Sequence, residues 1–544
     1  MNLEFNKNED HHKLNWSDMR RVMEKIYLGG GEKRLAKQRL KGKMTARERI
    51  DYLRDKDSEF LEIGLYAGYE MYEEYGGCAA GGVVGGITRV SGVQCLVVAN
   101  DASVKAGAWF PITGKKNLRF QEIAMENHLP IIYLVDSAGV FLPMQDEIFP
   151  DKEHFGRIFR NNARMSAMGI SQISAVMGSC VAGGAYLPAM SDEALIVDKT
   201  GSIFLAGSYL VKSAIGEDID NETLGGSITQ TDISGVIDDR FETDADCLNR
   251  IKYIMDKLPN KARNQFNRSD AAEPKKKVEE ILGILPADRA KPYETIEIIE
   301  RLVDNSEFEQ YKANYGKTIL CGYARIDGWA VGIVANNRQL VKAKKAKGAE
   351  MQFGGVIYSD SADKAARFIM NCNQKGIPLV FLQDVTGFMV GSRSEHGGII
   401  KDGAKMVNAM SNSTVPKFTV VIGNSYGAGN YAMCGKAYDP RLIVAWPTAK
   451  IAVMGGEQAA KVLLQIEKAS LKAQGKEISQ EDEDALLKKI IDRYNRQTTP
   501  EYAASKLWVD AIINPLDTRK WISNGIEMAD NAEVQDYKVG VLQT

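Results

Sequence analysis

An internal repeat constrains the fold of this 544-residue chain more than any other feature of its sequence. Four short segments of the first half recur in the same order in the second half, about 236 to 249 positions later. The pairs are 97–101 with 333–337, 130–136 with 378–384, 182–186 with 427–431, and 202–207 with 451–456. Ordered recurrence of this kind indicates duplication of a structural unit. We therefore predict two copies of one unit.

Each copy has the pattern of an α/β unit. Short apolar runs bounded by glycine or polar residues alternate with stretches of helical character such as 116–127. Such alternation predicts strands that are crossed by helices. The predicted strands of the first copy lie at 83–84, 95–99, 131–135, 173–177 and 194–197. Amphipathic helices are expected over 14–60, and the Lys-, Asn- and Pro-rich run 256–286 is predicted to link the copies.

Charge and cysteine content narrow the class of partner and the compartment. A net charge of -2 provides no overall field for nucleic acid or anionic membrane, so we expect neither as a partner. Seven cysteines without a CxxC spacing predict free thiols in a reducing compartment. The acidic N-terminus does not resemble a signal or transit peptide, and no apolar run approaches about 20 residues. A cytoplasmic location is expected.

Glycine-rich segments that follow predicted strands are the most informative candidates for chemistry. In the first copy these are 135–140 and 178–186, and in the second copy 383–388 and 425–430. Glycine allows close approach of the backbone, and a helix that starts there leaves its first amides unpaired. Unpaired amides that face a pocket can bind an oxyanion. Paired glycines can also serve tight packing alone, but their occurrence in both copies favours two oxyanion holes.

Other catalytic arrangements fit the sequence poorly. The five histidines have no metal-ligand spacing, so no metal is expected, and neither a P-loop nor a dinucleotide fingerprint is present. Residues 423–427 match the G-x-S-x-G pattern of serine hydrolases. That fold needs a histidine after the serine, and none follows His396, so we interpret the match as a glycine turn. The basic run 342–347 is predicted to be a solvated surface loop rather than a phosphate contact.

Six longer motifs resemble one protein family. From about Thr45 to its end, the chain resembles the carboxyltransferase β subunit of biotin-dependent acyl-CoA carboxylases, with greatest similarity to the 3-methylcrotonyl-CoA carboxylase type. The motifs that carry the resemblance are 45–50, 154–159, 182–193, 386–391, 425–431 and 454–460. The resemblance implies two tandem crotonase-like domains of spiralled ββα units. It places an acyl-CoA domain at 14–272 and a biotin domain at 273–535.

The family's chemistry assigns roles to the amide loops. The resemblance implies that CO2 passes from carboxybiotin to the enolate of an acyl-CoA thioester, so that backbone amides must stabilise two anions. The amides of Val140 and of Gly183 or Gly184 would hold the thioester oxygen. Those of Phe388 and of Ala428 or Gly429 would hold the biotin oxygen, with Gly387 and Gly427 beside it. In this family one site is shared by two chains, which implies a dimer or a hexamer.

The resemblance also predicts partners and leaves alternatives. Biotin would be attached to a separate α subunit that carries the biotin carboxylase and carrier domains. Leucine breakdown, with 3-methylcrotonyl-CoA as the substrate, is the expected pathway. The basic stretch 338–354 is longer than the methylcrotonyl-type pattern, which leaves propionyl-, geranyl- or other acyl-CoA carboxylases open. A glutaconyl-CoA decarboxylase-type α subunit and a non-catalytic CoA-binding subunit are further alternatives.

Overall fold

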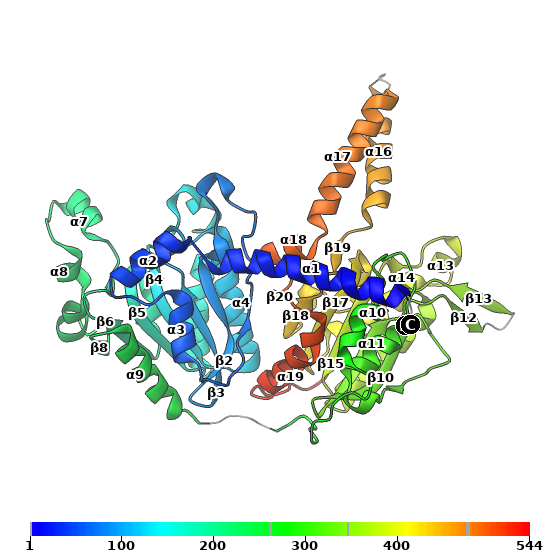
Figure 1. Cartoon of the computed structure of the whole chain (residues 1–544), viewed down its shortest axis with the longest axis horizontal. Helices are drawn as coiled ribbons and strands as arrows, with labels where there is room; N and C mark the ends of the chain where they lie inside the picture. The colour runs from blue at the N-terminus through cyan, green and yellow to red at the C-terminus, as the bar shows by residue number, and fades with distance from the viewer. Residues whose placement is uncertain (1–2, 260–263, 345–347, 475–478, 544) are drawn as a thin grey trace. The chain divides into compact units, whose positions relative to one another are not determined.

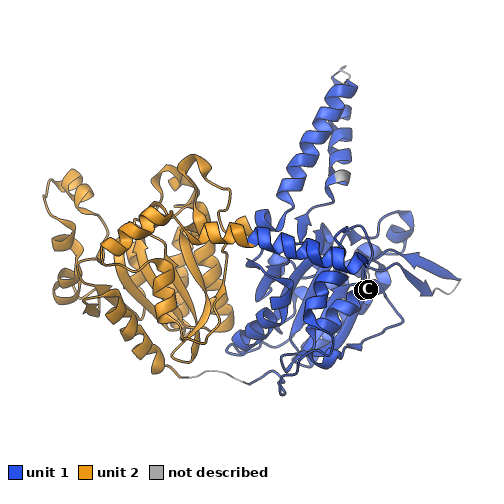
Figure 2. Cartoon of the chain, in the orientation of Figure 1, with its two compact units in different colours: residues 1–19, 264–503, 508–544 blue, residues 20–263, 504–507 orange. Residues whose placement is uncertain are grey.

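The computed structural model describes residues 3–259, 264–344, 348–474 and 479–543. The chain forms two compact units, which Figure 2 colours separately. Unit 1 contains residues 1–19, 264–503 and 508–544, and unit 2 contains residues 20–263 and 504–507. The N-terminal helix α1 (Leu3–Tyr27) therefore contributes to both units. No helix of the described residues is both long and apolar enough to cross a membrane.

Unit 2 is built on a sheet whose strand order is β1-β2-β3-β4-β5-β6-β8, with β7 beside β5. The β1–β2 and β2–β3 pairs are antiparallel and the others are parallel. The strands are β1 (Leu61–Glu62), β2 (Val83–Val90), β3 (Val93–Asn100), β4 (Ile131–Ser137), β5 (Gln172–Val181), β6 (Glu193–Val197), β7 (Ser202–Phe204) and β8 (Asp239–Phe241). The five strands predicted from the sequence are confirmed.

Helices accompany this sheet, as Figure 1 shows. They are α2 (Glu32–Leu40), α3 (Ala46–Leu53), α4 (Pro111–Asn127), α5 (Phe155–Ala167), α6 (Tyr186–Ala189), α7 (Ser208–Ile215), α8 (Asn221–Gly225) and α9 (Asp244–Asp256). All seven residues of β4 are buried, which is typical of a parallel strand covered on both faces. Helices α1, α2 and α3 confirm the helical character predicted for 14–60.

Unit 1 repeats the same sheet. Its strand order is β9-β10-β11-β15-β17-β18-β20, and β19 lies beside β17 as β7 lies beside β5. The strands are β9 (Glu309–Gln310), β10 (Ile319–Ile326), β11 (Trp329–Asn336), β15 (Leu379–Val385), β17 (Lys417–Tyr426), β18 (Leu442–Ala445), β19 (Lys450–Ala452) and β20 (Ala511–Ile512). The equal order of two eight-stranded sheets matches the duplication seen in the sequence.

The other elements of unit 1 are helices and short strands. The helices are α10 (Ile281–Ile284), α11 (Thr295–Leu302), α12 (Ser359–Gln374), α13 (Ser392–His396), α14 (Ile399–Ser411), α15 (Ala428–Ala432), α16 (Gly456–Ala473), α17 (Gln480–Gln497), α18 (Pro500–Ser505), which continues into unit 2, and α19 (Thr518–Ala529). Strands β14 (Val356–Ile357) and β16 (Gly387–Phe388) form a separate pair. Helices α16 and α17 form a hairpin that projects from the sheet (Figure 1).

The same helix cap occurs in both units and shows how closely the copies agree. The amide of Phe110 donates to Thr113 Oγ1 over 3.1 Å before α4, and the amide of Tyr358 donates to Ser361 Oγ over 2.9 Å before α12. Each hydroxyl satisfies a backbone donor at the start of a helix. The helices that follow the third strand of each sheet therefore start in the same way.

Two sequence predictions need correction. The predicted linker 256–286 is not irregular throughout, because Ile281 and Leu282 of α10 are buried in unit 1. The predicted surface loop 342–347 includes part of a two-stranded hairpin formed by β12 (Val341–Lys344) and β13 (Ala349–Gln352), and residues 345–347 lie outside the described part of the chain. The alternating burial of β12 explains the error, since its two lysines point to solvent while Val341 and Ala343 are buried.

Candidate active site

The first donor loop of unit 2 follows β4 and turns at Gly139, whose φ is 88°. Val140 then pairs with Trp109 in a parallel bridge: the Trp109 amide donates to Gly139 O over 2.8 Å and the Phe141 amide donates to Trp109 O over 2.9 Å. In a parallel bridge the residue between the two bonds directs its own amide to the opposite side. In the described chain the N–H of Val140 has no acceptor, so it is a donor available to a ligand.

The second donor loop of unit 2 is the 3-10 helix η5 (Ala182–Ala185), which follows β5 directly. Its first residue, Ala182, has a φ of 58° and so turns the chain away from the strand. The carbonyl of the N-cap residue Val181 accepts the first bond of a 3-10 helix, which comes from Gly184 three positions on. The amide of Gly183 precedes that bond. Of the two glycines predicted from the sequence, Gly183 is thus the freer donor.

The loop after β15 in unit 1 repeats the first donor loop. Gly387 has a φ of 134° and Phe388 pairs with Ile357 in the parallel β14–β16 pair. The Met389 amide donates to Ile357 O over 2.9 Å, just as the Phe141 amide donates to Trp109 O. The amide of Phe388 consequently faces away from β14, and among the described residues it has no acceptor. Phe388 is the counterpart of Val140.

The loop after β17 repeats the second donor loop. Gly427 has φ 54° and ψ -140°, a conformation open only to glycine, and it precedes α15. The first internal bond of this turn runs from the Asn430 amide to Gly427 O over 3.1 Å. The amides of Ala428 and Gly429 lie before that bond and have no acceptor in the described chain. Each unit thus presents one amide from a loop and one or two from a short helix start.

The space around the donor glycines differs from one position to the next. A Cβ added to Gly184 would meet no atom within 4 Å, whereas one added to Gly183 would meet the Phe155 ring at 2.7 Å. In unit 1 a Cβ at Gly429 would meet Val385 Cγ2 at 2.6 Å. Gly183 and Gly429 therefore need to be glycine for packing, and Gly184 borders open space.

A cationic cavity of about 420 Å³ opens beside the unit 2 loops. It reaches Ala138 of the first loop, two residues before Val140, and Ser179 of β5, four residues before Gly183. Its basic lining residues are Arg34, Lys37, Lys41, Lys43 and Lys105. An adjoining cavity of about 700 Å³ shares Arg34 and Lys105 with it. Clustered cations of this kind can bind phosphate groups.

Sequence reasoning missed this cavity, although a signal was present. Arg34, Lys37 and Lys41 are spaced by three and four positions, which places them on one face of α2 and its C-terminal end. None of the residues of α2 is buried, so the helix presents its cations rather than a packing face. The sequence interpretation treated this stretch only as amphipathic.

Two other sequence motifs prove to be structural. Ser425 of the G-x-S-x-G match is fully buried within β17, where its Oγ donates to Gln383 Oε1 over 2.7 Å. It is no exposed nucleophile, and the turn lies at Gly427, as predicted. His154 packs on Gly114 of α4, and its Nε2 lies 3.0 Å from Pro111 O. Burial lowers the pKa of His154, which favours a neutral ring in the scaffold.

Comparisons with known proteins agree with this geometry. Residues 37–539 match the carboxyl transferase domain family. The chain is 48% identical to a mitochondrial methylcrotonoyl-CoA carboxylase β chain of Dictyostelium discoideum, over 94% of this chain and 84% of the relative. It is 46% identical to the biotin-dependent 3-methylcrotonyl-coenzyme A carboxylase β1 subunit of Mycobacterium tuberculosis, over 98% and 97%. The geranyl-CoA carboxylase β subunit of P. aeruginosa has a TM-score of 0.86 and 36% identity, covering 100% of this chain and 98% of that one.

Proposed function

The chain belongs to the carboxyl transferase family, and from that premise we propose that it transfers CO2 from carboxybiotin to 3-methylcrotonyl-CoA. The observation that carries the proposal is the matched pair of donor sets, Val140 with Gly183 and Phe388 with Ala428 or Gly429. The reaction forms two successive anions, and each requires fixed hydrogen-bond donors. Two equivalent units with equivalent donors meet this requirement.

The acyl-CoA side is assigned to unit 2. The amides of Val140 and of Gly183 or Gly184 would donate to the thioester oxygen, which carries the negative charge when a proton leaves the acyl chain. The cations of the 420 Å³ cavity would hold the CoA phosphates. The negative phosphates would then lie near the cations, and the developing negative oxygen would lie near the donor amides. The proposed family domain for this side is 14–272.

The biotin side is assigned to unit 1, within the proposed family domain 273–535. Carboxybiotin, carried by a separate α subunit, supplies the CO2. The unpaired amides of Phe388 and of Ala428 or Gly429 suit the ureido oxygen of biotin, a neutral acceptor that becomes an anion when CO2 leaves. Gly387 and Gly427 shape this hole through conformations that residues with side chains rarely adopt. The cytoplasmic location expected from the sequence remains part of this proposal.

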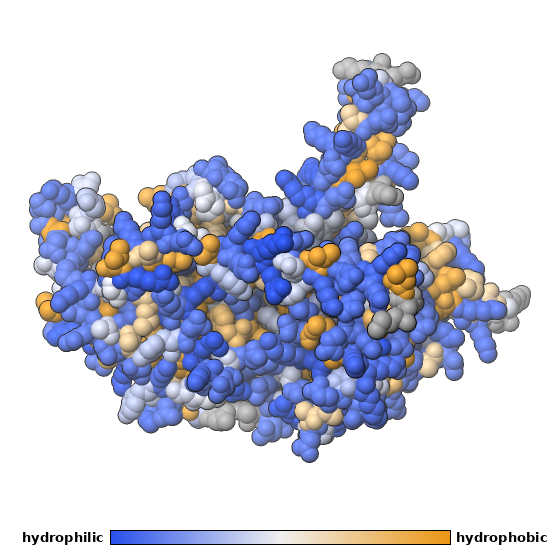
Figure 3. Space-filling model, viewed as in Figure 1, coloured by the Kyte–Doolittle hydropathy of each residue, from blue (hydrophilic) through white to orange (hydrophobic). Residues whose placement is uncertain are grey.

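A site shared by two copies of the chain is supported by the apolar surface of both units. Exposed apolar side chains follow the strands that carry the donor loops and the short strands beside them, β7 and β19. In unit 2 they are Leu142, Phe149, Tyr186, Leu205, Tyr209 and Leu210, and in unit 1 Val390, Ile400, Tyr431, Val453, Leu463 and Ile466. Figure 3 shows apolar residues along the hairpin of α16 and α17. Such patches are typical of interfaces, and a closed dimer or hexamer would cover them.

The acyl group is the finer part of the proposal. The two relatives near 47% identity are named for methylcrotonyl-CoA, and the structural relative at 36% is named for geranyl-CoA, so identity favours the smaller acyl group. Both substrates share the 3-methyl-2-enoyl head, and they differ in the length of the tail. The pocket must therefore limit chain length beyond the head.

The reverse reaction tests the proposal without the α subunit. The purified chain is mixed with 3-methylglutaconyl-CoA and free biotin, and release of 3-methylcrotonyl-CoA is followed by chromatography. We expect biotin-dependent release, and a higher kcat/KM for 3-methylcrotonyl-CoA than for geranyl-CoA or propionyl-CoA when the α subunit is added. No biotin-dependent transfer with any of these thioesters would overturn the function. Preference for geranyl-CoA would overturn the substrate alone.

A further inference from the structure

A buried carboxylate occupies the same position in both units and is not part of either donor set. Asp136 is the penultimate residue of the buried strand β4, and Asp384 holds the equivalent place in β15. Each has one neighbour that fixes its backbone: the Asp136 amide donates to Asn100 Oδ1 over 3.3 Å, and the Asp384 amide donates to Asn336 Oδ1 over 3.1 Å. The sequence repeat contained both pairs.

Each carboxylate lies at a break in strand register. Between β4 and β5 the pairing steps from Val135 with Val176 to Ser137 with Cys180, so residues 177–179 bulge opposite Asp136. Between β15 and β17 it steps from Gln383 with Val421 to Val385 with Ser425, so residues 422–424 bulge opposite Asp384. A bulge that recurs in two copies is a designed feature that redirects the chain beyond it.

The side chain holds the bulge directly in unit 1, and through an arginine in unit 2. Asp384 Oδ1 accepts a hydrogen bond from the Asn424 amide over 2.9 Å, within the bulge of β17. In unit 2, Arg49 joins the two parts, since its Nη2 donates to Met177 O over 3.0 Å and its Nη1 lies 3.4 Å from Asp136 Oδ2. Gly178 and Gly423 leave room for the carboxylates of Asp136 and Asp384. A Cβ at either glycine would clash with the carboxylate.

This position connects the two donors of each hole. Asp136 lies four residues before Val140, and the bulge that it holds lies five residues before Gly183. Asp384 lies four residues before Phe388, and its bulge lies five residues before Ala428. Each carboxylate thus fixes the point where the chain leaves the first strand and the point where it leaves the bulged strand. Moving it would change the separation of the two donor amides.

Cations fix the two carboxylates by different means. Lys43 Nζ lies 2.5 Å from Asp136 Oδ2, and both residues line the cationic cavity. Asp384, which is fully buried, receives Arg289 Nη2 at 2.5 Å and the hydroxyl of Tyr293 at 2.8 Å. Buried charges of this kind hold one geometry because breaking the pair leaves an uncompensated charge.

We propose that Asp136 and Asp384 are positioning residues, each of which sets the spacing of the two backbone donors of one oxyanion hole. This inference rests on the proposed carboxyl transfer. Neither carboxylate touches the reacting atoms in this assignment. Their effect is exerted through the bulges, so it should appear in kcat.

Replacement of each carboxylate by its amide tests the inference. Asp136→Asn keeps the size of the side chain and loses its charge, and we expect kcat for acyl-CoA carboxylation to fall about 10²-fold, the cost of misplacing a group by about 1 Å. Decarboxylation of carboxybiotin without acyl-CoA should persist, so the ratio of the two partial reactions should change. Asp384→Asn should lower both reactions. All measurements use the complex with the biotinylated α subunit.

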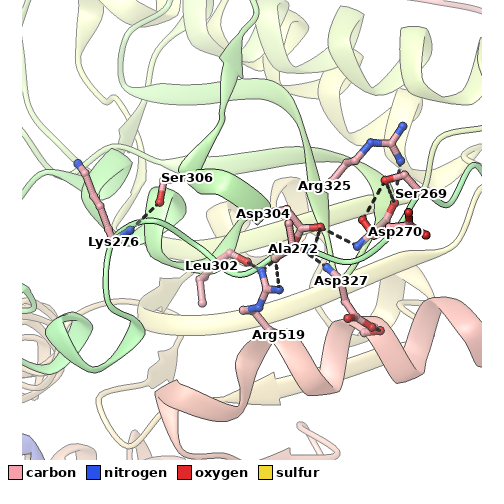
Figure 4. A network of polar contacts seen from close by, with 12 residues as sticks. Ser269, Asp270, Ala272, Lys276, Leu302, Asp304, Ser306, Arg325, Asp327 and Arg519 are labelled. Atoms are coloured by element: carbon pink, nitrogen blue, oxygen red, sulfur yellow. Dashed lines mark hydrogen bonds and ion pairs between the residues drawn. The ribbon is translucent and has the colours of Figure 1, made fainter.

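A buried carboxylate outside the holes and outside the Arg49 contacts serves as the control. Asp304 accepts from Arg519 and from the Asp327 amide (Figure 4), over 2.9 and 2.8 Å. Asp304→Asn should lower Tm but leave the ratio of the two partial reactions unchanged.

The outcomes separate this inference from the proposed function. If the parent protein transfers no carboxyl group, the function fails. If the parent is active and the folded Asp136→Asn and Asp384→Asn proteins keep the parental kcat, or if the Asp304→Asn control shifts the reaction ratio equally, the positioning role is refuted. Should an Asp variant not fold, Asn100→Ala or Asn336→Ala removes only the acceptor of the Asp amide. A kcat loss in the same partial reaction supports the role, and parental kcat contradicts it.

Discussion

At the scale of single residues, the donor loops depend on backbone conformations rather than on side-chain chemistry. Gly139 and Gly387 have positive φ before the first donor, and Ala182 and Gly427 have positive φ before the second. Ala182 is the exception among these four, since a left-handed conformation costs a residue with a Cβ about 1 kcal/mol. The strain is tolerated where β5 and η5 fix the chain on both sides.

Gly184→Val should separate the two holes. A Cβ at this position enters open space, so the variant should fold, while its methyl groups crowd the donors of the thioester hole. We expect carboxylation of acyl-CoA to fall by about 10²–10³-fold, and decarboxylation of carboxybiotin to remain measurable. Steady-state kinetics of both reactions, with circular dichroism and oligomer size matched to the parent, measure the effect. Normal acyl-CoA carboxylation by the folded variant would refute the assignment.

Lys116 should make stability depend on pH. Its Nζ is buried and donates to Ala80 O and Val83 O over 2.8 and 2.6 Å, and burial lowers its pKa to about 7. The unfolded chain has the higher pKa and binds the proton more tightly, so this group gives increasing stability from about pH 7 to pH 10. Lys116→Met should raise Tm most near pH 6, and the difference from the parent should shrink as pH rises. A pH-independent difference in Tm would contradict the account.

The sequence could identify the donor residues but not the groups that place them. Val140 and Phe388 follow apolar runs in both copies, so their loops were predictable from the repeat. Asp136 and Asp384 also lie in the repeat, yet a carboxylate at the end of a strand gives no sign of a register shift. The choice between Gly183 and Gly184 depends on which carbonyl closes the 3-10 turn, and that is set by tertiary structure.

At the scale of elements, helix α2 offers a test of the acyl-CoA side. Lys37 and the adjoining Lys41 line the cationic cavity, whereas Arg39 of the same helix pairs with Glu48 outside it. We expect Lys37→Ala and Lys41→Ala each to raise KM for acyl-CoA about fivefold, equal to about 1 kcal/mol, with kcat unchanged. Arg39→Ala is the matched control. Equal effects of all three changes, or a loss in kcat alone, would show that the cavity is not part of the acyl-CoA binding site.

The strands were more predictable than the other elements. The continuous apolar run of β4 can only be a strand buried on both faces, given the short length and the helices around it. The hairpin β12–β13 was missed because alternating lysine and small apolar residues over four positions also fit a loop. Helix α10 was missed because four residues are too few for a helical period to be recognised.

At the scale of the whole molecule, the duplication would explain how a single chain provides the two oxyanion holes that we propose. Both copies keep the sheet order, the register shift and the positions of the donor amides. They differ in other features: four lysines and one arginine line a cavity in unit 2, and the hairpin α16–α17 rises from unit 1. In the proposed function the common features would stabilise an anion, and the different features would select the thioester or the biotin.

The central claim is that one site combines unit 2 of one chain with unit 1 of another. Gly184→Val is designed to damage the thioester hole, and Ala428→Val the biotin hole. The most direct test is to co-express the two chains with different tags and to purify the product through both tags. In a dimer with shared sites, one of two sites would have both holes intact, so about half of the parental carboxylation activity should return. If each site lies within one chain, every site keeps one damaged hole. Activity no higher than that of the two variants alone would contradict the claim.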